Sequence, residues 1–346
     1  MMEVMDMLYG IVDLGSNSVR LNIYKADDHH FSLVMSRKES VGLASYVKNG
    51  QMTSEGIERA CYVLHDFQTL LRDFSIREMH VFATAALRNA KNSRAAVEEI
   101  MNRTGVEIKV LSGEAEAELD FVGVSHAMGR AAESLGDGLM VDIGGASTEL
   151  VIYKNGAIRK KTSIPIGSLN TYDAYVSNIL PTRMERKAIK QAVLDALKGD
   201  ADLNYGSYSI ICGIGGSIRA AKKLNNYLFQ LAPDNTRIKA SNLKKMIKLF
   251  QNDEGAAIPT ETLDVLLSVV PDRVRTVLPG MIILNTLLKH FKSEWVEVTK
   301  AGVRDGYLYR YVLQSGKEEE ENVDAEPVKE ETADGFNTSG EESPQA

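Results

Sequence analysis

The stretch VDLGSNSVRLNIYK at residues 12–25 returns without a gap as VDIGGASTELVIYK at residues 141–154. The two segments carry the same residue at eight of fourteen positions. Each consists of an apolar run, an Asp-x-Gly-x-x-Ser turn and an alternating apolar run, a pattern typical of a β-hairpin with a tight turn. The repeat predicts two equivalent halves whose turns hold one phosphorylated ligand from both sides.

The repeat continues beyond the hairpins. In each half, three expected strands are followed by helix, strand and helix, an alternation typical of α/β units around a mixed sheet. In the first half we expect strands over 8–12, 19–26, 31–37, 79–83 and 107–111, and helices over 53–72, 93–104 and 113–127. In the second half we expect strands over 139–142, 149–153, 159–164, 209–212 and 295–299, and helices over 182–197, from 217, within 241–290 and over 304–313. A duplicated α/β fold with its site in the cleft between the copies is the economical interpretation.

Length and composition suit a globular protein of two domains: 346 residues, 44% hydrophobic and 25% charged. We place the domains at residues 1–127 and 128–315, with the last helix able to pack back on the first domain. Cys61 and Cys212 match no metal-ligand spacing and are expected to be reduced, as in the cytoplasm. The start of the chain does not resemble a signal peptide, and no apolar run approaches the ~20 residues of a membrane span.

The net charge of −7 is unevenly distributed. Residues 316–346 carry eleven acidic residues and two lysines, a net −9, which leaves +2 for the rest of the chain. This segment is poor in apolar residues, so we expect a disordered, solubilising acidic tail. The rest of the chain then has no net negative charge that would repel an anionic substrate.

The two repeated turns carry the first functional prediction. Glycines at the turn remove the Cβ that would keep the backbone away from an oxyanion, and Ser18 and Ser147 add hydroxyl donors. Asp13 and Asp142 end the preceding strands, where they can hold a hydrated divalent cation or orient water. Where the first copy has Arg20, which can serve phosphate or pair with a carboxylate, the second has Glu149. We therefore expect Asp142 and Glu149 to form the metal-facing side.

The helix expected from residue 113 singles out a second functional residue. Glu114 and Glu118 share one helix face, whereas Glu116 points about 200° away, towards the interior, because the helix has 3.6 residues per turn. Near a helix N-terminus, the helix dipole is expected to keep Glu116 ionised, as a base that accepts a proton from water must be. The competing interpretation is that all three acids only stabilise the first turn.

Further motifs are weaker on their own. The turn at residues 213–217 follows a strand and opens a helix, which suits a phosphate or nucleotide but also tight helix–strand packing. Thr84 and Arg88 follow another strand, and the planar guanidinium of Arg88 suits phosphate oxygens, although a surface ion pair is an alternative. Arg273, Arg275 and Arg304 have no assigned role. No histidine pair has metal-ligand spacing, and there is neither a P-loop nor a Ser-His-Asp signature.

These motifs together resemble the exopolyphosphatase / guanosine pentaphosphate phosphohydrolase (Ppx/GppA) family, a branch of the superfamily of actin-like, sugar kinase and Hsp70 ATPase folds. The resemblance covers about residues 8–314 in the short, two-domain form. It rests on DLGSNSVRL at 13–21, Ala83-Thr84 to Leu87-Arg88, Ser112-Gly113 to Glu116-Ala117, DIGGASTEL at 142–150, Gly213 to Ser217, and GVRDG at 302–306. The resemblance implies two duplicated ribonuclease H-like domains with the active site between them.

The resemblance also implies an activity, a cofactor and site residues. The activity is release of orthophosphate from the ends of inorganic polyphosphate; the alternative is removal of the 5′ γ-phosphate of guanosine pentaphosphate. Glu116 matches the catalytic glutamate, and Asp142 and Glu149 match the acids associated with Mg²⁺. Asp13 is expected at the metal as well, from its position at the end of a strand. The expected phosphate-binding residues are Gly15, Ser16, Asn17, Ser18, Thr84, Arg88, Gly144, Gly145, Ala146, Ser147, Thr148, Gly215, Gly216 and Ser217. Neither nucleic acid nor a membrane is expected as a partner, and a homodimer is possible.

Three positions depart from the family pattern: Ala115 replaces a glutamate, Glu118 an arginine and Ala146 a glycine. We expect the methyl group of Ala146 to narrow the approach of phosphate, and the lost carboxylate at Ala115 to shift the pKa of Glu116. Two alternative functions stay open at this stage. One is a kinase or ATPase with an adenosine pocket at residues 213–217, and the other is a sensor that binds polyphosphate or guanosine tetraphosphate without cleaving it.

Overall fold

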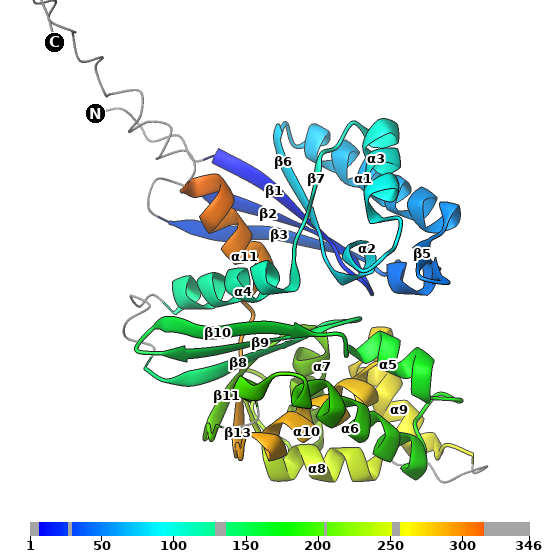
Figure 1. Cartoon of the computed structure of the whole chain (residues 1–346), viewed down its shortest axis with the longest axis vertical. Helices are drawn as coiled ribbons and strands as arrows, with labels where there is room; N and C mark the ends of the chain where they lie inside the picture. Colours follow the sequence, from blue (N-terminus) through cyan, green and yellow to red (C-terminus); the bar gives the residue numbers. More distant parts are fainter. Residues whose placement is uncertain (1–6, 27–29, 129–135, 204–205, 251–256, 315–346) are drawn as a thin grey trace, which may run out of the picture.

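The computed structural model describes residues 7–26, 30–128, 136–203, 206–250 and 257–314. It contains two α/β halves stacked one above the other, each built on its own mixed sheet (Figure 1). The expected fold class of two similar α/β halves on mixed sheets is therefore confirmed. The expected acidic tail lies outside the described residues.

The first sheet has the order β3-β2-β1-β6-β7. Its strands are β1 (Met7–Leu14), β2 (Val19–Ala26), β3 (Phe31–Glu39), β6 (Glu78–Ala83) and β7 (Ile108–Val110). β1, β2 and β3 are antiparallel neighbours, whereas β6 and β7 run parallel to β1. The first half also contains η1 (Leu43–Tyr46), β4 (Val47–Lys48), β5 (Gln51–Met52), α1 (Ser54–Asp73), α2 (Ala85–Arg88) and α3 (Ser93–Thr104).

The second sheet has the order β10-β9-β8-β11-β13-β12. Its strands are β8 (Gly138–Ile143), β9 (Thr148–Lys154), β10 (Ala157–Ile164), β11 (Ile210–Ile214), β12 (Arg237–Lys239) and β13 (Trp295–Val298). The helices are α5 (Ser168–Tyr175), α6 (Arg183–Lys198), η3 (Ala201–Leu203), α7 (Gly216–Leu228), α8 (Ala240–Leu249), α9 (Thr260–Val269), η4 (Pro271–Arg273) and α10 (Val277–His290). No helix among the described ranges is both long and apolar enough to cross a bilayer.

The sequence repeat is also a repeat of strand register. Asp13 of β1 pairs with Arg20 of β2, and Asp142 of β8 pairs with Glu149 of β9, in the same place of each hairpin. The registers agree because the apolar alternation of each hairpin buries one set of side chains, and a slip by one residue would expose it. The divergent pair, Arg20 and Glu149, therefore occupies equivalent positions opposite the two aspartates.

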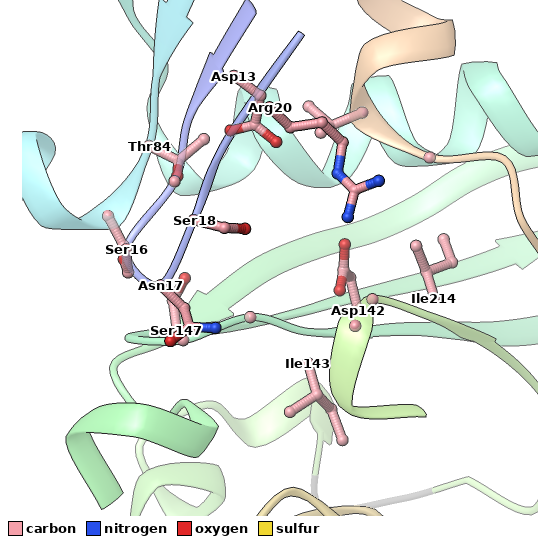
Figure 2. A pocket seen from close by; sticks show the side chains of 18 of the residues that line it. Asp13, Ser16, Asn17, Ser18, Arg20, Thr84, Asp142, Ile143, Ser147 and Ile214 are labelled. Atoms are coloured by element: carbon pink, nitrogen blue, oxygen red, sulfur yellow. The ribbon is translucent and has the colours of Figure 1, made fainter. Parts of the chain in front are cut away.

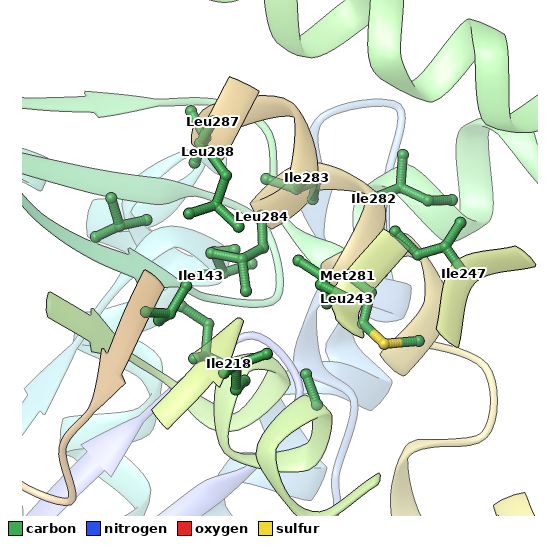
Figure 3. Packing of buried hydrophobic residues seen from close by; sticks show 14 of the residues in the cluster. Ile143, Ile218, Leu243, Ile247, Met281, Ile282, Ile283, Leu284, Leu287 and Leu288 are labelled. Atoms are coloured by element: carbon green, nitrogen blue, oxygen red, sulfur yellow. The ribbon is translucent and has the colours of Figure 1, made fainter. Parts of the chain in front are cut away.

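The second half is built around a buried helix. Along α10 the side chains of residues 281–284, 287 and 288 are all buried. They pack with Ile143, Ile218, Leu243 and Ile247 from the surrounding strands and helices (Figure 3). Because α10 is apolar around most of its circumference, it is a core helix rather than an amphipathic surface helix.

One helix, α4 (Gly113–Ala127), lies between the two sheets (Figure 1). Its Leu119 packs with Ile11 and Phe82 of the first half. Its Phe121 packs in a different cluster with Met140 of the second half. The buried faces of α4 thus serve both halves, so a domain boundary drawn after residue 127 cuts through shared packing.

The end of the described chain returns to the first half. α11 (Val303–Tyr307) and the π-helical segment η5 (Leu308–Leu313) bring residues 303, 307 and 308 into the cluster around Ile11 and Phe82. The Phe82 and Tyr307 rings stack with centroids 4.9 Å apart. We expected one continuous helix over 304–313; the structure changes helix type after Tyr307.

Several short elements were not foreseen from the sequence. β12 has only three residues, with Ile238 buried between two exposed side chains, which is too short a stretch for the alternation to be recognised. α5 and α2 are also too short for a helical period to be recognised. The helical stretch 241–290 is interrupted by proline: Pro259 precedes α9 and Pro271 opens η4. Cys61 and Cys212 are both free, as expected.

The packing of α4 on α11 depends on glycines. A Cβ at Gly306 would lie 1.9 Å from the backbone oxygen of Leu119, and a Cβ at Gly123 would lie 2.4 Å from that of Gly302. Neither obstacle is a side-chain end that could rotate away. The two helices can therefore approach this closely only because no side chain stands between their backbones.

Replacing Gly306 by alanine should therefore destabilise the protein. We expect Gly306→Ala to lower the free energy of unfolding by about 1–3 kcal/mol, the usual cost of overpacking. Urea denaturation followed by circular dichroism measures this. Gly199→Ala is the matched control, because a Cβ there would meet its nearest atom at an ordinary 3.6 Å. Equal stability of the two variants would contradict the close packing described here.

Candidate active site between the two halves

A polar pocket lies between the halves, at the two repeated turns. It is lined from above by Gly15, Ser16, Asn17, Ser18, Arg20, Thr84 and Glu116, and from below by Asp142, Gly144, Gly145, Ser147, Gly215 and Gly216. Figure 2 shows Arg20 of β2 and Asp142 of β8 pointing into the space between the turns from opposite sides. Sequence positions more than 100 residues apart thus meet in one site.

The two turns touch each other. A Cβ at Gly145 would lie 3.0 Å from the Cβ of Ser16 and 3.3 Å from the amide nitrogen of Asn17. A side chain at position 145 would therefore push the two turns slightly apart. This contact makes the pocket narrow, with a volume of about 110 Å³.

Each turn accepts hydrogen bonds from the segment that follows the third strand of its half, β3 or β10. In the first half, the amides of Gly42 and Ala44 donate to the carbonyls of Asn17 and Ser16, at 3.0 and 2.9 Å. In the second half, the amides of residues 168 and 169 donate to the carbonyls of residues 144 and 145, at 2.9 and 2.8 Å. The C=O and N–H of one trans peptide point in opposite directions. The N–H groups of residues 17, 18 and 145 are therefore turned away from the bracing segments, which suits anion binding.

The third glycine turn contributes the start of α7. Gly215 has a φ of +92°, and a Cβ there would lie 2.1 Å from Oδ1 of Asp142. A Cβ at Gly216 would lie 2.3 Å from a guanidinium nitrogen of Arg273. Both glycines are needed for these charged groups to approach the N-terminus of α7, which itself favours anions. Ser217 is turned away from the pocket and donates to Ser168 at 2.9 Å.

Four arginines gather at the pocket: Arg20, Arg219, Arg273 and Arg304. Arg304 donates to Oδ2 of Asp13 at 2.7 Å, and Arg20 donates to Ser36 at 3.1 Å. Burial and the nearby guanidinium of Arg304 lower the pKa of Arg20 to about 10. Burial also lowers the pKa of Arg219 and of Arg273. Three carboxyl groups, of Asp13, Glu116 and Asp142, line the same pocket, so its lining has one more cation than anions when all are ionised, and a bound polyanion would neutralise this charge.

The catalytic candidate, Glu116, lies near the start of α4 and lines the same pocket. Its Oε2 accepts from Nη1 of Arg88 at 2.7 Å, and the same nitrogen donates to the carbonyl of Leu111 at 3.1 Å. Arg88 is thus an ion-pair partner of Glu116 here and is not among the residues that line the pocket. Its Nη2 also lies 3.7 Å from Oε1 of Glu149 and 3.5 Å from the hydroxyl of Ser147.

Buried carboxyl groups surround Glu116. Burial, followed by the repulsion of Glu149, raises the pKa of Glu116 well above its usual value despite Arg88. Burial and the repulsion of Asp142 raise the pKa of Glu149 to about 7, and burial raises the pKa of Asp142 to about 6. The expectation that the helix dipole would dominate at Glu116 is wrong, because burial and like charges outweigh the ~0.3–1 kcal/mol of a dipole interaction.

The donor set suits a divalent cation held by few protein ligands. Oδ1 of Asp142 is buried, has no hydrogen-bond partner within the described chain and belongs to a residue that lines the pocket. Among the described residues, no three Asp, Glu, His or Cys side chains converge on one point. Mg²⁺ is commonly held by one or two carboxylates together with substrate phosphates and water. Glu149 lies behind the pocket and accepts from Ser163 at 2.8 Å. Oδ2 of Asp13 is held by Arg304, whereas its Oδ1 is buried without a hydrogen-bond partner among the described residues, as Oδ1 of Asp142 is.

The structure thus brings most of the sequence-predicted residues together. Four predicted phosphate ligands do not line the pocket: Arg88, Ala146, Thr148 and Ser217. The carbonyl of Ala146 accepts from the side chain of Asn170 at 2.9 Å.

Two residues at the site were missed by the sequence analysis. Arg219 lies on α7, three residues after Gly216, a spacing that could have indicated the same helix end. Asp120 is 1% exposed, one turn after Glu116, and neither carboxyl oxygen has a hydrogen-bond partner in the described part of the chain. Burial and the repulsion of Asp142 raise the pKa of Asp120 well above its usual value. Its place among apolar neighbours in the sequence gave no signal of this role.

Comparison with known proteins agrees with this architecture. Residues 22–315 match the model of the Ppx/GppA phosphatase family. The crystal structure of the family member from Aquifex aeolicus superposes with a TM-score of 0.70 at 26% identity, over 89% of this chain and 98% of that one. An exopolyphosphatase from Cytophaga hutchinsonii shares the fold, with a TM-score of 0.74 at 21% identity over 89% of this chain and 98% of that one.

A curated relative, the bifunctional 3-dehydroquinate synthase/phosphatase of Fusobacterium nucleatum, is 28% identical over 305 residues, 84% of this chain. The matched part is 44% of that protein, so this chain spans less than half the length of the relative. The fold and the family match define a phosphatase of the two-lobed α/β kind. The chain belongs to the Ppx/GppA phosphatase family.

The ion pair between Asp13 and Arg304 joins the first strand to α11, and both side chains are largely buried, with 14% and 13% exposed. Arg304→Met should leave the Asp13 charge unpaired and lower the free energy of unfolding by about 3–5 kcal/mol. Adding Asp13→Asn to this variant should recover part of the lost stability. Urea denaturation of the two single variants and of the double variant measures the effect. Arg94→Met, which removes the exposed pair with Glu98, should cost less than about 0.5 kcal/mol. Additive effects at residues 13 and 304 would show that the pair is not coupled.

Proposed function

We propose that this chain is a phosphohydrolase that releases orthophosphate from the end of inorganic polyphosphate. The observation that carries this proposal is the position of Glu116, which faces a narrow pocket formed by two amide-bearing turns and four arginines. Phosphoryl transfer requires positioning and neutralisation of charge on the phosphate oxygens, and these groups supply both. A narrow, cationic pocket also favours an unbranched chain of phosphates over a bulky organic group at the reacting end.

The residues divide the chemical work. The N–H groups of the turns, Ser18 and the arginines bind the oxygens of the terminal phosphate. Glu116 accepts a proton from a water molecule aligned with the terminal phosphorus, while Arg88 fixes the orientation of its carboxylate. The water oxygen forms a bond to that phosphorus, the bridging P–O bond breaks, and the shortened chain leaves as an oxyanion. Glu116 then returns its proton to solvent.

We further propose Mg²⁺ as the cofactor, with Asp142 and Asp13 as its protein ligands. Each of these residues lines the pocket with a buried Oδ1 that has no hydrogen-bond partner in the described part of the chain, which supports this choice. A bound cation would supply charge neutralisation for the phosphate oxygens. Glu149 lies behind this position, where its charge can support the cation without direct contact.

Guanosine pentaphosphate is the second candidate substrate, since the family is named for both activities. Orthophosphate release from long polyphosphate, short polyphosphate and guanosine pentaphosphate, measured in parallel, separates the candidates. The proposal expects the highest kcat/KM on polyphosphate. No release from any of the three under any divalent cation would instead indicate a binding protein.

Replacing the base should remove hydrolysis but not binding. A general base contributes about 10²–10⁴-fold, so we expect Glu116→Gln to lower kcat by that factor while polyphosphate still binds. Phosphate release and filter binding on the same preparation measure the two effects. Glu114→Gln, on the other face of α4, is the control and should leave kcat within twofold, roughly the noise of surface substitutions. An unchanged rate for Glu116→Gln would exclude it as the base.

The rate should rise with pH across the acid range. Glu116 works only when ionised, and its pKa lies well above the usual value because of burial and Glu149. Glu116 therefore stays protonated up to a higher pH than an ordinary glutamate. On acidification kcat/KM should begin to fall at a pH well above 4.5. The kcat/KM for polyphosphate, measured from pH 5 to 9, tests this, and Glu116→Gln should flatten the limb. A wild-type profile that is level down to pH 5 would be incompatible with the proposed base.

A further inference from the structure

A second opening between the two halves adjoins the polar pocket at Arg88. It is a cavity of about 380 Å³, which we call the side cavity, and it is lined by residues 88–89, 112–114, 147, 162–163 and 165. These residues belong to the end of α2, the start of α4, the turn between β8 and β9, and the end of β10. Ser147 lines both the polar pocket and the side cavity, so the two spaces are neighbours.

Arg88 separates the two spaces. Of the two it lines only the side cavity, but its Nη1 donates to Glu116 at 2.7 Å and its Nη2 lies 3.5 Å from the hydroxyl of Ser147, and both of these partners line the polar pocket. Nη1 is also held by the carbonyl of Leu111 at 3.1 Å. Nη2 has longer contacts, since it lies 3.7 Å from Oε1 of Glu149. An anion can therefore replace the contacts of Nη2 more easily than those of Nη1.

The side cavity leads to solvent and suits a small oxyanion. Its outer residues, at positions 89, 112, 114 and 165, are exposed. The side chains at positions 112, 147, 162 and 163 carry hydroxyl groups, and Arg88 adds a guanidinium. Hydroxyl and guanidinium groups donate hydrogen bonds to oxyanions. The carboxyl group of Glu114 is on the exposed side, where solvent and salt screen its charge.

The proposed reaction forms its product in an enclosed position. The attacking water and the leaving chain lie on opposite sides of the terminal phosphorus, because the displacement is in line. Glu116 activates that water, so the new orthophosphate lies between Glu116 and the shortened chain. The polar pocket measures about 110 Å³, and a chain that is still bound in it obstructs the way back. Arg88 stands behind Glu116, with the side cavity beyond it.

We propose that orthophosphate leaves through the side cavity, past Arg88, while the shortened polyphosphate stays bound in the polar pocket. Nη2 of Arg88 exchanges its long contacts for a phosphate oxygen, and the hydroxyl groups of Ser147 and Thr162 receive the ion on its way to solvent. No covalent bond forms or breaks in this step. The proposal rests on the proposed function, because it requires orthophosphate to be formed beside Glu116.

Filling the side cavity in the full chain tests this route. Thr162→Trp fills it from β10 and Asn89→Trp fills it from the end of α2, so a folding defect in one variant does not decide the result. Asn102→Trp is the matched control, since Asn102 is exposed on α3 and lines neither the side cavity nor the polar pocket.

The first measurement is the ratio of kcat on long polyphosphate to kcat on inorganic triphosphate. Cleavage of triphosphate leaves pyrophosphate, which is short and leaves by the mouth of the polar pocket, so orthophosphate can follow it. Both filled variants should lower the ratio about tenfold, the effect of ~1.4 kcal/mol added to the barrier for release. Asn102→Trp should leave the ratio unchanged.

The second measurement detects retained product directly. Acid quenching during the first turnovers on long polyphosphate gives total orthophosphate, whereas a fluorescent phosphate-binding protein reports only the orthophosphate that has left the site. The excess of total over free orthophosphate should be larger in both filled variants than in Asn102→Trp and the unsubstituted chain.

Two outcomes would overturn the exit route alone. One is an unchanged ratio in both filled variants, which includes an equal loss of kcat on the two substrates. The other is a raised KM for long polyphosphate without retained orthophosphate, which would make the side cavity the entrance of the chain. Failure of the proposed function is recognised separately, by the absence of orthophosphate release from the unsubstituted chain, and the route would fail with it.

Discussion

The balance of buried charges between the two halves is the constraint on which this structure depends. Guanidinium groups of Arg20, Arg219, Arg273 and Arg304 and the carboxyl groups of Asp13, Glu116 and Asp142 line one pocket between the halves. A buried charge is costly unless it is paired or neutralised. The protein pairs Asp13 with Arg304 and Glu116 with Arg88, and it leaves further guanidinium groups at the pocket, where an anionic ligand can neutralise them.

Backbone packing makes this arrangement possible. Gly145 lets the second turn touch the first, Gly215 admits the carboxylate of Asp142, and Gly306 lets α11 lie against α4. At each of these places an added Cβ would meet atoms of another segment at 3.0 Å or less. Gly145 and Gly215, which belong to the glycine turns seen in the sequence, therefore determine how closely the segments around the pocket approach. The two halves are joined by α4, whose packing on both sheets places Glu116 at their boundary.

Much of the fold and part of the site could be predicted from the chain alone. The hairpin repeat predicted the paired turns, and most long strands and helices follow from apolar periodicity. The short elements β12 and α5 carry too few residues to show a period. Asp120 was missed because it is an ordinary helical residue in sequence and only its burial beside Asp142 distinguishes it, whereas Arg219 was missed although it follows Gly216 in the first turn of α7. Arg88 was expected at phosphate, but the folded chain turns it towards Glu116 and the carbonyl of Leu111.

The sequence by itself determined the duplication, the registers that place Asp13 and Asp142 at equivalent strand ends, and the inward direction of Glu116, because these follow from local periods of two and 3.6 residues. Only the tertiary structure decided which charged groups lie next to one another and how strongly each shifts the pKa of its neighbours. The pKa of Glu116 is raised, against the helix-dipole expectation, by burial and by Glu149, which lies on a strand of the other half. Desolvation and through-space repulsion depend on distances between segments far apart in the chain, and no local pattern contains those distances.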